Sequence, residues 1–517
     1  MVKTEDQSIV PENHRARVAG GAGFAFLGRM GALIEAASMI AFTWMYGAAT
    51  FGLYAALWAY IKVSTAVADV AMSTALQRFV PRVSKSEADM AAGHALKLSF
   101  LISCIFALIG TLLAPKLAPF INAAEADAVR LITVIQIYVW VLPFWTLVEV
   151  GTAAIRARRT FGPEIKVRIF YEQGLRLVAA TSFAYAGMLT YGLFLAHLVS
   201  VLLAALLALR LISKHYNLRA VLTAPMTGPI ARDMRKFGLS IMPANISKKL
   251  FSEFPVMFLN FLLPGAAGAA ASGFYAVARK IASALQAVRL TFEYVMAPLA
   301  AERDGHGDHT ALQEMFAFAT RLSLCVALPF GAALILARGD ILAAMKPEFQ
   351  AAAAAIAILC VGRVIEASTG PATAIIEMLG HRLLPAFNGL MGLAALLLLG
   401  LYLIPLYGVT GAAVAAAVGI NVTAFLSLLQ ATFLFKLFPY DKHILRPLGA
   451  TLIFTSIIAA LIPYSTEWPA PFGIIVSIAL LALALILLVR YGLAATDAEA
   501  LGKISIWLRP KSRNTKS

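Results

Sequence analysis

The sequence predicts an all-α integral membrane protein with about 14 transmembrane helices, arranged as two six-helix repeat lobes around a central cavity plus two C-terminal helices. Composition supports this fold class, because 60% of the 517 residues are hydrophobic, 14% are charged and the mean hydropathy is +0.81. A soluble protein of this length is far less apolar. The apolar residues also form long segments, and some of these segments are repeated along the chain.

The internal repeat rests on two pairs of short motifs. Phe51-Gly52-Leu53-Tyr54-Ala55 opens one apolar segment, and Ser272-Gly273-Phe274-Tyr275-Ala276 opens another roughly 220 residues later. Tyr191-Gly192 and Tyr407-Gly408 each precede an apolar helix at nearly the same spacing. Many secondary transporters are built from repeats of hydrophobic segments, with the substrate site between the repeats.

The transmembrane segments follow from length. A helix needs about 20 apolar residues to cross a hydrocarbon core about 30 Å thick. This length predicts spans near residues 18–46, 52–77, 96–114, 129–154, 165–187, 190–212, 239–263, 268–298, 315–337, 350–378, 384–405, 408–435, 447–464 and 470–491. They define six segments in chain order. These are an N-terminal tail (1–17), an N-lobe (18–213), an inter-lobe linker (214–238), a C-lobe (239–436), a final helix pair (437–492) and a basic tail (493–517).

The basic residues predict the orientation. The net charge of +16 does not form one block, as a nucleic-acid site would require; Lys and Arg gather instead in the loops after even-numbered spans and in both tails. The odd-numbered loops are short and hold few Lys or Arg. Both termini with their tails are therefore expected to be cytoplasmic, and so is the linker at 214–238.

Several kinds of chemistry have no signature in the sequence. There is no G-x-x-x-x-G-K-[ST] loop to bind nucleotide phosphates. The three cysteines lie in apolar segments, and the eight histidines lack metal-ligand spacing. No external loop is long enough for a catalytic domain with paired carboxylates, which a glycosyltransferase or polymerase would need. We expect neither enzyme activity nor a cofactor or metal.

Ionisable residues inside the spans each need a reason, because a charge at the bilayer centre costs roughly 2.5–3.5 kcal/mol. Four acid and base pairs stand at helical spacing, which favours neutralisation on one helix face. These pairs are Glu172 with Arg176, Lys249 with Glu253, Arg289 with Glu293, and Arg363 with Glu366. His197, in the sixth span, is interpreted as a buried, hydrogen-bonded histidine in preference to a proton carrier.

Another set of basic residues lacks a partner at helical spacing. Arg29, Lys62, Lys248 and Arg279, with Lys280 beside the last, lie about ten residues into their spans, near the bilayer midplane. One interpretation is that they snorkel or pair with acids on other helices. The other, which we favour, is that they line a water-filled cavity and bind an anionic substrate.

Three carboxylates at membrane depth are candidates for coupling to an ion gradient. They are Asp69, Glu35 and Glu253. Asp69 is preferred, because it stands seven residues after Lys62 and should share its helix face, so its protonation would change whether the lysine is available to an anion.

The order and spacing of several motifs resemble the polysaccharide flippases of the multidrug/oligosaccharidyl-lipid/polysaccharide exporter superfamily, Wzx type. The matching residues are Phe51-Gly52-Leu53-Tyr54, Asp69 through Thr74-Ala75-Leu76-Gln77-Arg78-Phe79, Lys236-Phe237-Gly238-Leu239-Ser240-Ile241-Met242-Pro243, Gly273-Phe274-Tyr275-Ala276-Val277-Ala278-Arg279, Leu379-Gly380-His381-Arg382 with Asn388, and Pro405-Leu406-Tyr407-Gly408-Val409-Thr410-Gly411-Ala412-Ala413. They cover most of residues 20–435.

The resemblance implies a transporter in the bacterial inner membrane that moves a polyprenyl-pyrophosphate-linked oligosaccharide for O-antigen, capsule or exopolysaccharide assembly. The resemblance also implies that the protein lies in the lipid bilayer and binds no nucleic acid. A polysaccharide polymerase and its co-polymerase are candidate partners. A lipid II flippase and a cation-coupled drug exporter of the same superfamily remain as alternatives. Unpaired bases would repel the cationic amphiphiles that such exporters commonly take, which favours an anionic substrate.

Overall fold

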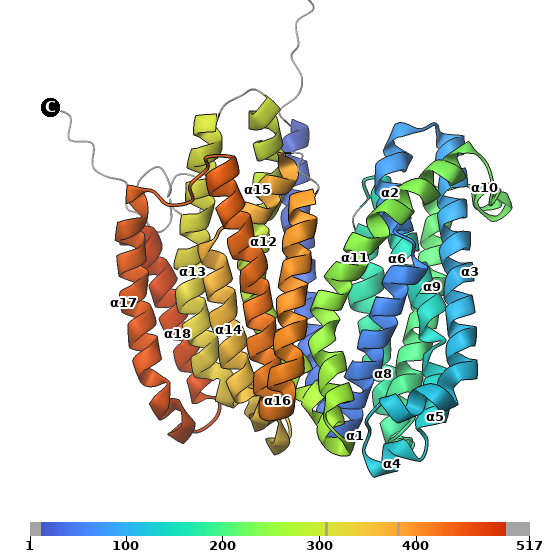
Figure 1. Cartoon of the computed structure of the whole chain (residues 1–517), viewed down its shortest axis with the longest axis horizontal. Coiled ribbons are helices and arrows are strands. Elements are labelled where there is room, and N and C mark those ends of the chain that lie inside the picture. The colour runs from blue at the N-terminus through green and yellow to red at the C-terminus, as the bar shows by residue number, and fades with distance from the viewer. Residues whose placement is uncertain (1–11, 161, 306–308, 380–382, 493–517) are drawn as a thin grey trace, which may run out of the picture. The chain divides into compact units, whose positions relative to one another are not determined.

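The computed structural model describes residues 12–160, 162–305, 309–379 and 383–492, and none of these residues forms a strand. Figure 1 shows the helices, and the predicted all-α class is confirmed. The α-helices are α1 (Glu12–Ala68), α2 (Met72–Phe79), α3 (Lys85–Leu117), α4 (Glu125–Ala128), α5 (Leu131–Tyr138), α6 (Val141–Ala157), α7 (Gly162–Ile165), α8 (Glu172–Tyr185), α9 (Gly192–His215), α10 (Leu218–Thr223), α11 (Pro229–Leu262), α12 (Gly265–Gly305), α13 (His309–Ala343), α14 (Ala353–Ser368), α15 (Ala372–Met378), α16 (Leu383–Leu434), α17 (Leu445–Leu461) and α18 (Phe472–Leu487).

Eight helical stretches among the described residues are long and apolar enough to cross a membrane. The chain is thus a multi-pass membrane protein, while the total of about fourteen spans stays a prediction. Two of these stretches, in α1 and α16, contain a break at a glycine: Gly47 has φ 81° and Gly408 has φ 55°. Glycine adopts this left-handed region without the steric cost that a Cβ adds. Both breaks fall where the sequence predicts one span to end and the next to begin.

One predicted span is shorter than expected. Helix α1 ends at Ala68, and Val70 and Ala71 adopt left-handed φ angles of 49° and 52° before α2 begins at Met72. The expected span 52–77 is therefore interrupted. Non-glycine residues rarely adopt this conformation, and apolar ones carry no sequence signal for it.

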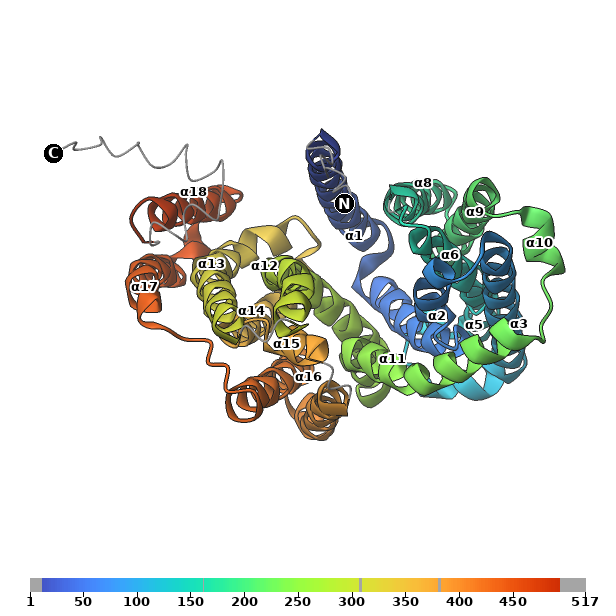
Figure 2. The same ribbon diagram turned by 90° about the horizontal axis from the view of Figure 1, so that it is seen from above.

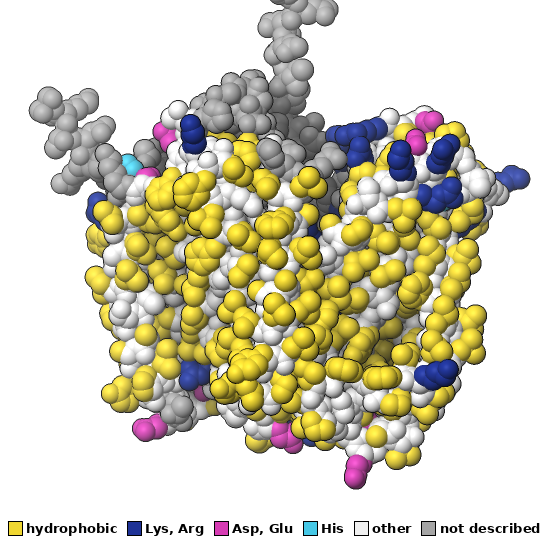
Figure 3. Space-filling view, in the orientation of Figure 1, with side chains coloured by type: hydrophobic (Ala, Val, Ile, Leu, Met, Phe, Trp, Pro, Cys, Tyr) yellow, Lys and Arg dark blue, Asp and Glu magenta, His cyan; other side chains and the backbone are white. Residues whose placement is uncertain are grey.

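The chain divides into two compact units. Unit 1 comprises residues 1–46, 61–118 and 130–245, and unit 2 comprises residues 47–60, 119–129 and 246–517. Within unit 1, α6 packs against α2, α3 and α9; within unit 2, α13 packs against α12, α14, α17 and α18 (Figure 2). On the face shown in Figure 3, hydrophobic side chains cover the middle of the helices, and charged side chains gather near the helix ends. This distribution suits a hydrocarbon layer between two aqueous phases.

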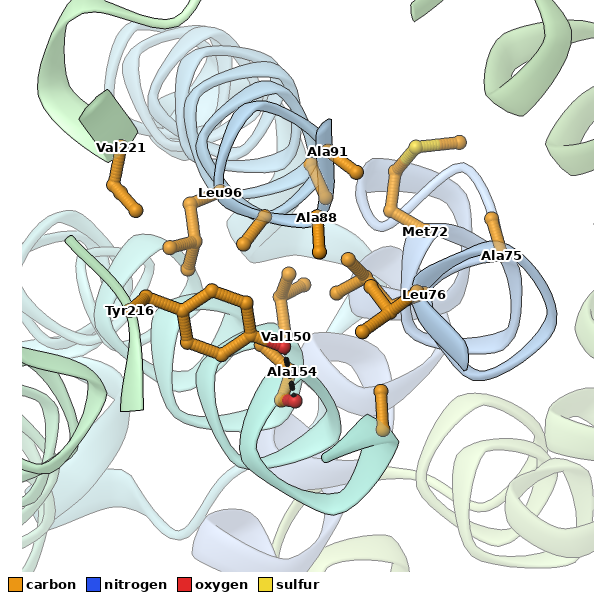
Figure 4. Packing of buried hydrophobic residues seen from close by; sticks show 14 of the residues in the cluster. Met72, Ala75, Leu76, Ala88, Ala91, Leu96, Val150, Ala154, Tyr216 and Val221 are labelled. Carbon is orange, nitrogen blue, oxygen red and sulfur yellow. Dashed lines mark hydrogen bonds between the residues drawn. The ribbon is translucent and has the colours of Figure 1, made fainter. Parts of the chain in front are cut away.

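The core of unit 1 includes an apolar cluster drawn in Figure 4. Leu76 of α2 and Ala88 of α3 are fully buried there, and Val150 of α6 packs beside them. Burying a leucine or valine side chain of this kind contributes roughly 1.5–3 kcal/mol. The Tyr216 hydroxyl lies at this cluster and donates a hydrogen bond to the Ala154 carbonyl oxygen at 2.7 Å. The end of α9 is thereby fixed to α6.

The two copies of the first repeated motif contact each other within unit 2. A Cβ added to Gly52 would lie 1.8 Å from the Ala269 carbonyl oxygen, and one added to Gly273 would lie 3.0 Å from the Gly52 Cα. Only glycine at position 52 permits this approach of α1 to α12. The rings of Phe51 and Phe274 flank the contact, and both meet Phe349, at centroid distances of 6.1 Å and 5.1 Å.

Candidate functional site: charged clusters of the two units

Unit 2 buries a charged pair formed between two helices. Arg279 of α12 donates from Nη1 to Glu253 Oε2 of α11 at 3.1 Å, and it also donates to the Ser252 carbonyl oxygen. The Ser252 hydroxyl donates to Glu253 Oε1 at 3.1 Å. Glu253 is 4% exposed. The sequence placed Arg279 and Glu253 in different roles, one for substrate and one for ion coupling, whereas the structure brings the two together.

A second group of charges lies in the same unit. Glu366 of α14 accepts from Arg363 Nη1 at 2.7 Å, which confirms the pair predicted from their i,i+3 spacing. Its other oxygen lies 3.2 Å from Nη2 of Arg289, which comes from α12. The sequence paired Arg289 with Glu293, whose side chain lies outside those that the structure describes. One carboxylate thus faces two guanidinium groups.

Tyr275 connects these two groups. Its side chain is 2% exposed, and it lies within electrostatic range of Arg279, Arg363 and Glu253. We call Glu253, Arg279, Arg289, Arg363 and Glu366 the arginine cluster. Its three guanidinium groups and two carboxylates give these five residues an excess of one positive charge. Guanidinium groups among membrane helices are typical of sites that bind anions.

The other basic residues singled out in unit 2 lie differently. Lys248 Nζ lies 4.0 Å from Glu377 Oε1 of α15, and its side chain is 77% exposed, so this pair contributes little to stability. Lys280 follows Arg279 on α12 and is half-buried. Arg29 belongs to α1, but its side chain lies outside the described ones.

Unit 1 holds a separate cluster around His197 of α9, which is fully buried. The Tyr138 hydroxyl of α5 lies 2.8 Å from His197 Nδ1, and Arg176 Nη1 of α8 lies 3.3 Å from Nε2. Glu172, also of α8, is 2% exposed, with Oε1 3.3 Å from Arg176 Nη1 and 3.6 Å from His197 Nε2. The predicted Glu172 and Arg176 pair is confirmed, and we call these four residues the histidine cluster.

Two predicted site residues belong to the surroundings of the histidine cluster. Glu35 lies within electrostatic range of Glu172, and Lys62 lies within electrostatic range of His197. Both come from α1. The structure therefore brings these two residues together with buried ionisable side chains of α8 and α9.

Asp69, the preferred coupling residue, stands at the break between α1 and α2. Its Oδ1 accepts a hydrogen bond from the Ser73 backbone N–H at 3.2 Å, and its carbonyl oxygen accepts one from the Ser99 hydroxyl at 3.2 Å. The carboxylate thereby satisfies an N–H group in the first turn of α2, as an N-terminal cap does. Asp69 is the first residue after α1, and its backbone N–H still donates to the Thr65 carbonyl oxygen at 2.8 Å, as in a helix.

Sequence reasoning missed how residues from different helices combine. Nothing in the local pattern marks Tyr138 as a partner of His197, or Arg289 as a second partner of Glu366. The available signal was indirect: both Arg289 and Arg363 are costly in a membrane span, and an excess of such bases suggests a shared partner.

Comparison with known proteins shows which family and which fold the chain matches. A family model described as "Polysaccharide biosynthesis protein" matches residues 46–345. A comparison of the sequence with curated proteins finds no match. Among solved structures, the chain is similar to the lipid II flippase MurJ in an inward closed conformation, with 13% identity, a TM-score of 0.70, and coverage of 90% of this chain and 97% of MurJ.

Two multidrug transporters are also similar. An inward-facing multidrug resistance MATE family transporter of the MOP superfamily has 16% identity and a TM-score of 0.58, over 79% of this chain and 94% of that one. The MATE multidrug transporter DinF-BH has 15% identity and a TM-score of 0.58, over 83% and 98%. These similarities show that the chain shares the fold of MurJ and of these two multidrug transporters. Because the family model matches more than half of its length, the chain belongs to the polysaccharide biosynthesis protein family.

Proposed function

We propose that this protein is a flippase of the Wzx type, which moves a polyprenyl-pyrophosphate-linked oligosaccharide across the bacterial inner membrane for O-antigen, capsule or exopolysaccharide assembly. The observation that carries the proposal is the gathering of three guanidinium groups, those of Arg279, Arg289 and Arg363, around two carboxylates among membrane helices. Family membership and the transporter fold supply the context. The sugars and phosphates of such a lipid cannot cross hydrocarbon unaided, whereas its prenyl chain is soluble there.

The sign of the charge separates this function from drug export. Three arginines against two glutamates would repel a cationic amphiphile, and guanidinium groups bind phosphate oxygens through paired N–H donors. Each arginine of the cluster already forms an ion pair with a carboxylate, so a pyrophosphate would compete with Glu253 and Glu366 for these guanidinium groups. Binding of the substrate would then weaken contacts among α11, α12 and α14, which is a route from binding to conformational change.

Arg29, Lys62, Lys248, Arg279 and Lys280 remain the proposed substrate-binding set, extended here by Arg289 and Arg363. Transport would proceed by alternating access between the N-lobe at 18–213 and the C-lobe at 239–436. Asp69, Glu35 and Glu253 remain candidates for ion coupling. We expect Asp69→Asn to alter the dependence of transport on the proton or sodium gradient; transport insensitive to the substitution at every gradient tested would remove Asp69 from this role.

Deletion of the gene tests the function. The mutant should lose the surface polysaccharide and accumulate its lipid-linked oligosaccharide on the cytoplasmic leaflet. Accumulation of lipid II with normal surface polysaccharide would instead identify a lipid II flippase, and unchanged lipids with increased drug sensitivity would identify a drug exporter.

A further inference from the structure

The histidine cluster of unit 1 is more deeply buried than the arginine cluster of unit 2. Its groups are separated from water, because His197 is 0% exposed and Glu172 is 2% exposed. Its charges come from α8, and its two other hydrogen-bonding groups, Tyr138 and His197, come from α5 and α9. A buried carboxylate, guanidinium and imidazole in contact form a set that responds as a unit to one added proton.

The contacts identify the protonation state of His197 in this conformation. A guanidinium can only donate, so Nε2, at 3.3 Å from Arg176 Nη1, has to accept. Nδ1 then carries the proton and donates to the Tyr138 hydroxyl oxygen, 2.8 Å away. The imidazole is therefore neutral, and the charges of Arg176 and Glu172 balance.

One acceptor in the cluster is unused. Glu172 Oε1 accepts no hydrogen bond in the described part of the chain, although Arg176 Nη1 lies 3.3 Å away and His197 Nε2 lies 3.6 Å away. Such a buried acceptor without a hydrogen bond is costly. A proton on Nε2 would give this oxygen a donor, at the position where the neutral ring offers none.

Other charged groups lie within electrostatic range of the cluster, on α1 and on the turn that precedes α8. Glu35 of α1 faces Glu172, Lys62 of α1 faces His197, and Arg168 of the π-helical turn Lys166–Tyr171 also lies within range of Glu172. Arg168 is itself paired with Glu149 of α6, at 3.5 Å, and with Glu164, at 3.3 Å. The Ser200 hydroxyl donates to the His197 carbonyl oxygen at 2.9 Å. A change of charge at His197 thus acts on residues of α1 and α8 at once.

We propose that the histidine cluster is a proton-binding site that couples protonation to the packing of α8 against α9. One proton from the aqueous phase forms the N–H bond at His197 Nε2, and no other bond breaks. Nε2 can then no longer accept from Arg176, and the imidazolium and guanidinium repel each other. Glu172 Oε1, 3.6 Å from Nε2, can accept from the new N–H once Arg176 has moved.

Burial makes this coupling obligatory. The imidazolium is unfavourable in the closed, water-free arrangement, so proton uptake has to accompany a rearrangement of α8 and α9. The inference rests on the proposed transporter function only in that a proton gradient would drive the cycle; the site itself does not depend on which lipid is carried.

Substrate-free measurements on the full-length protein test the site. In purified protein with labelled histidine, the His197 side-chain resonance, identified by its absence in His197→Gln, should shift as the pH is lowered from about 8 into the acidic range. Over the same range, hydrogen exchange of peptides from α8 and α9 should increase in the wild type. In His197→Gln this pH-dependent increase should be lost.

His94→Gln is the matched control. His94 of α3 is also buried in unit 1, at 1% exposed, but its ring nitrogens have no hydrogen-bond partner among the described residues. This variant should keep the pH response of α8 and α9. Should His197→Gln fold poorly, Glu172→Gln removes the negative charge beside His197 while keeping the side-chain shape, and its exchange increase should occur only at more acidic pH.

A resonance of His197 that stays constant over the pH range would overturn the proposal, as would a full exchange response in folded His197→Gln. The assay contains no substrate, so its failure would leave the flippase assignment intact. Conversely, loss of surface polysaccharide in arginine-cluster variants that keep the exchange response would support the flippase assignment and leave the proton site standing.

Discussion

Arg279 combines an ion pair and a backbone contact through one guanidinium group. It donates to Glu253 and to the Ser252 carbonyl oxygen, a geometry that the compact ammonium of lysine cannot reproduce. We expect Arg279→Lys to lower surface polysaccharide about tenfold while protein abundance stays normal, since a hydrogen bond to a charged group contributes roughly 1.5–3 kcal/mol.

The control for this prediction is Arg219→Lys, at an exposed position in α10. It should leave polysaccharide unchanged. If Arg279→Lys instead causes loss of the protein from the membrane, the residue has a structural role and does not belong to the substrate site.

Tyr216 lies just beyond the last residue of α9, and burial raises the pKa of its hydroxyl to about 12 from the ordinary 10.0. The raised pKa means that its contribution to stability is complete below pH 10.0 and is lost as the pH rises through about 12. Tyr216→Phe should therefore lower the free energy of unfolding by about 1 kcal/mol at neutral pH, through loss of the bond to Ala154.

A thermal melt of the purified variant measures this effect. Thr223→Val is a control, because its hydroxyl bonds only within its own short exposed helix. Equal melting temperatures for Tyr216→Phe and the wild type would show that the hydrogen bond does not stabilise the core.

Residue pairs on one helix could be predicted, and pairs between helices could not. Glu172 with Arg176 and Arg363 with Glu366 were found because i,i+4 and i,i+3 spacing places two side chains on one face. Glu253 with Arg279 stands 26 residues apart, on two helices whose rotation is set by packing. No local rule encodes that rotation, so the composition of the arginine cluster became visible only in the structure.

At the scale of elements, the contact between α1 and α12 depends on Gly52. The added Cβ of an alanine would meet the Ala269 backbone at 1.8 Å, which forces the helices apart. Gly52→Ala should therefore destabilise the protein by at least the 1–3 kcal/mol typical of overpacking, seen as reduced abundance and a lower melting temperature.

Gly389→Ala provides the comparison. This glycine lies in α16 with nothing within 4 Å of its added Cβ. Alanine there should be neutral or stabilising by about 0.5–1 kcal/mol, since it lowers the entropy cost of helix formation. Equal melting temperatures for the two variants would contradict the packing role of Gly52.

Helix breaks at glycine were predictable, and the break after α1 was not. Tyr407-Gly408 marks a boundary because glycine readily takes positive φ. At Asp69, the chain turns through Val70 and Ala71, whose left-handed angles are held by packing and by the capping carboxylate. Apolar residues at such positions look like a continuing helix.

For the whole molecule, the long apolar segments predicted the all-α membrane class, because a helix satisfies the backbone N–H and C=O groups of such a segment within hydrocarbon. The asymmetry of Lys and Arg then predicts the topology. Reporter fusions after Gly47, Gly187 and Tyr464 should read as external, and fusions after Arg159, Arg219 and the C-terminus as cytoplasmic. A cytoplasmic signal at Gly187, in the turn between α8 and α9, would contradict the fourteen-span arrangement.

The contact of Gly52 with Gly273 joins equivalent positions in the two copies of one motif. In an isologous dimer of identical chains, one substitution at such a position would place the new side chain on both sides of the contact at once. In a single chain that carries both copies, each glycine can be substituted by itself, so a side chain can be added to one side of this contact while the other stays glycine.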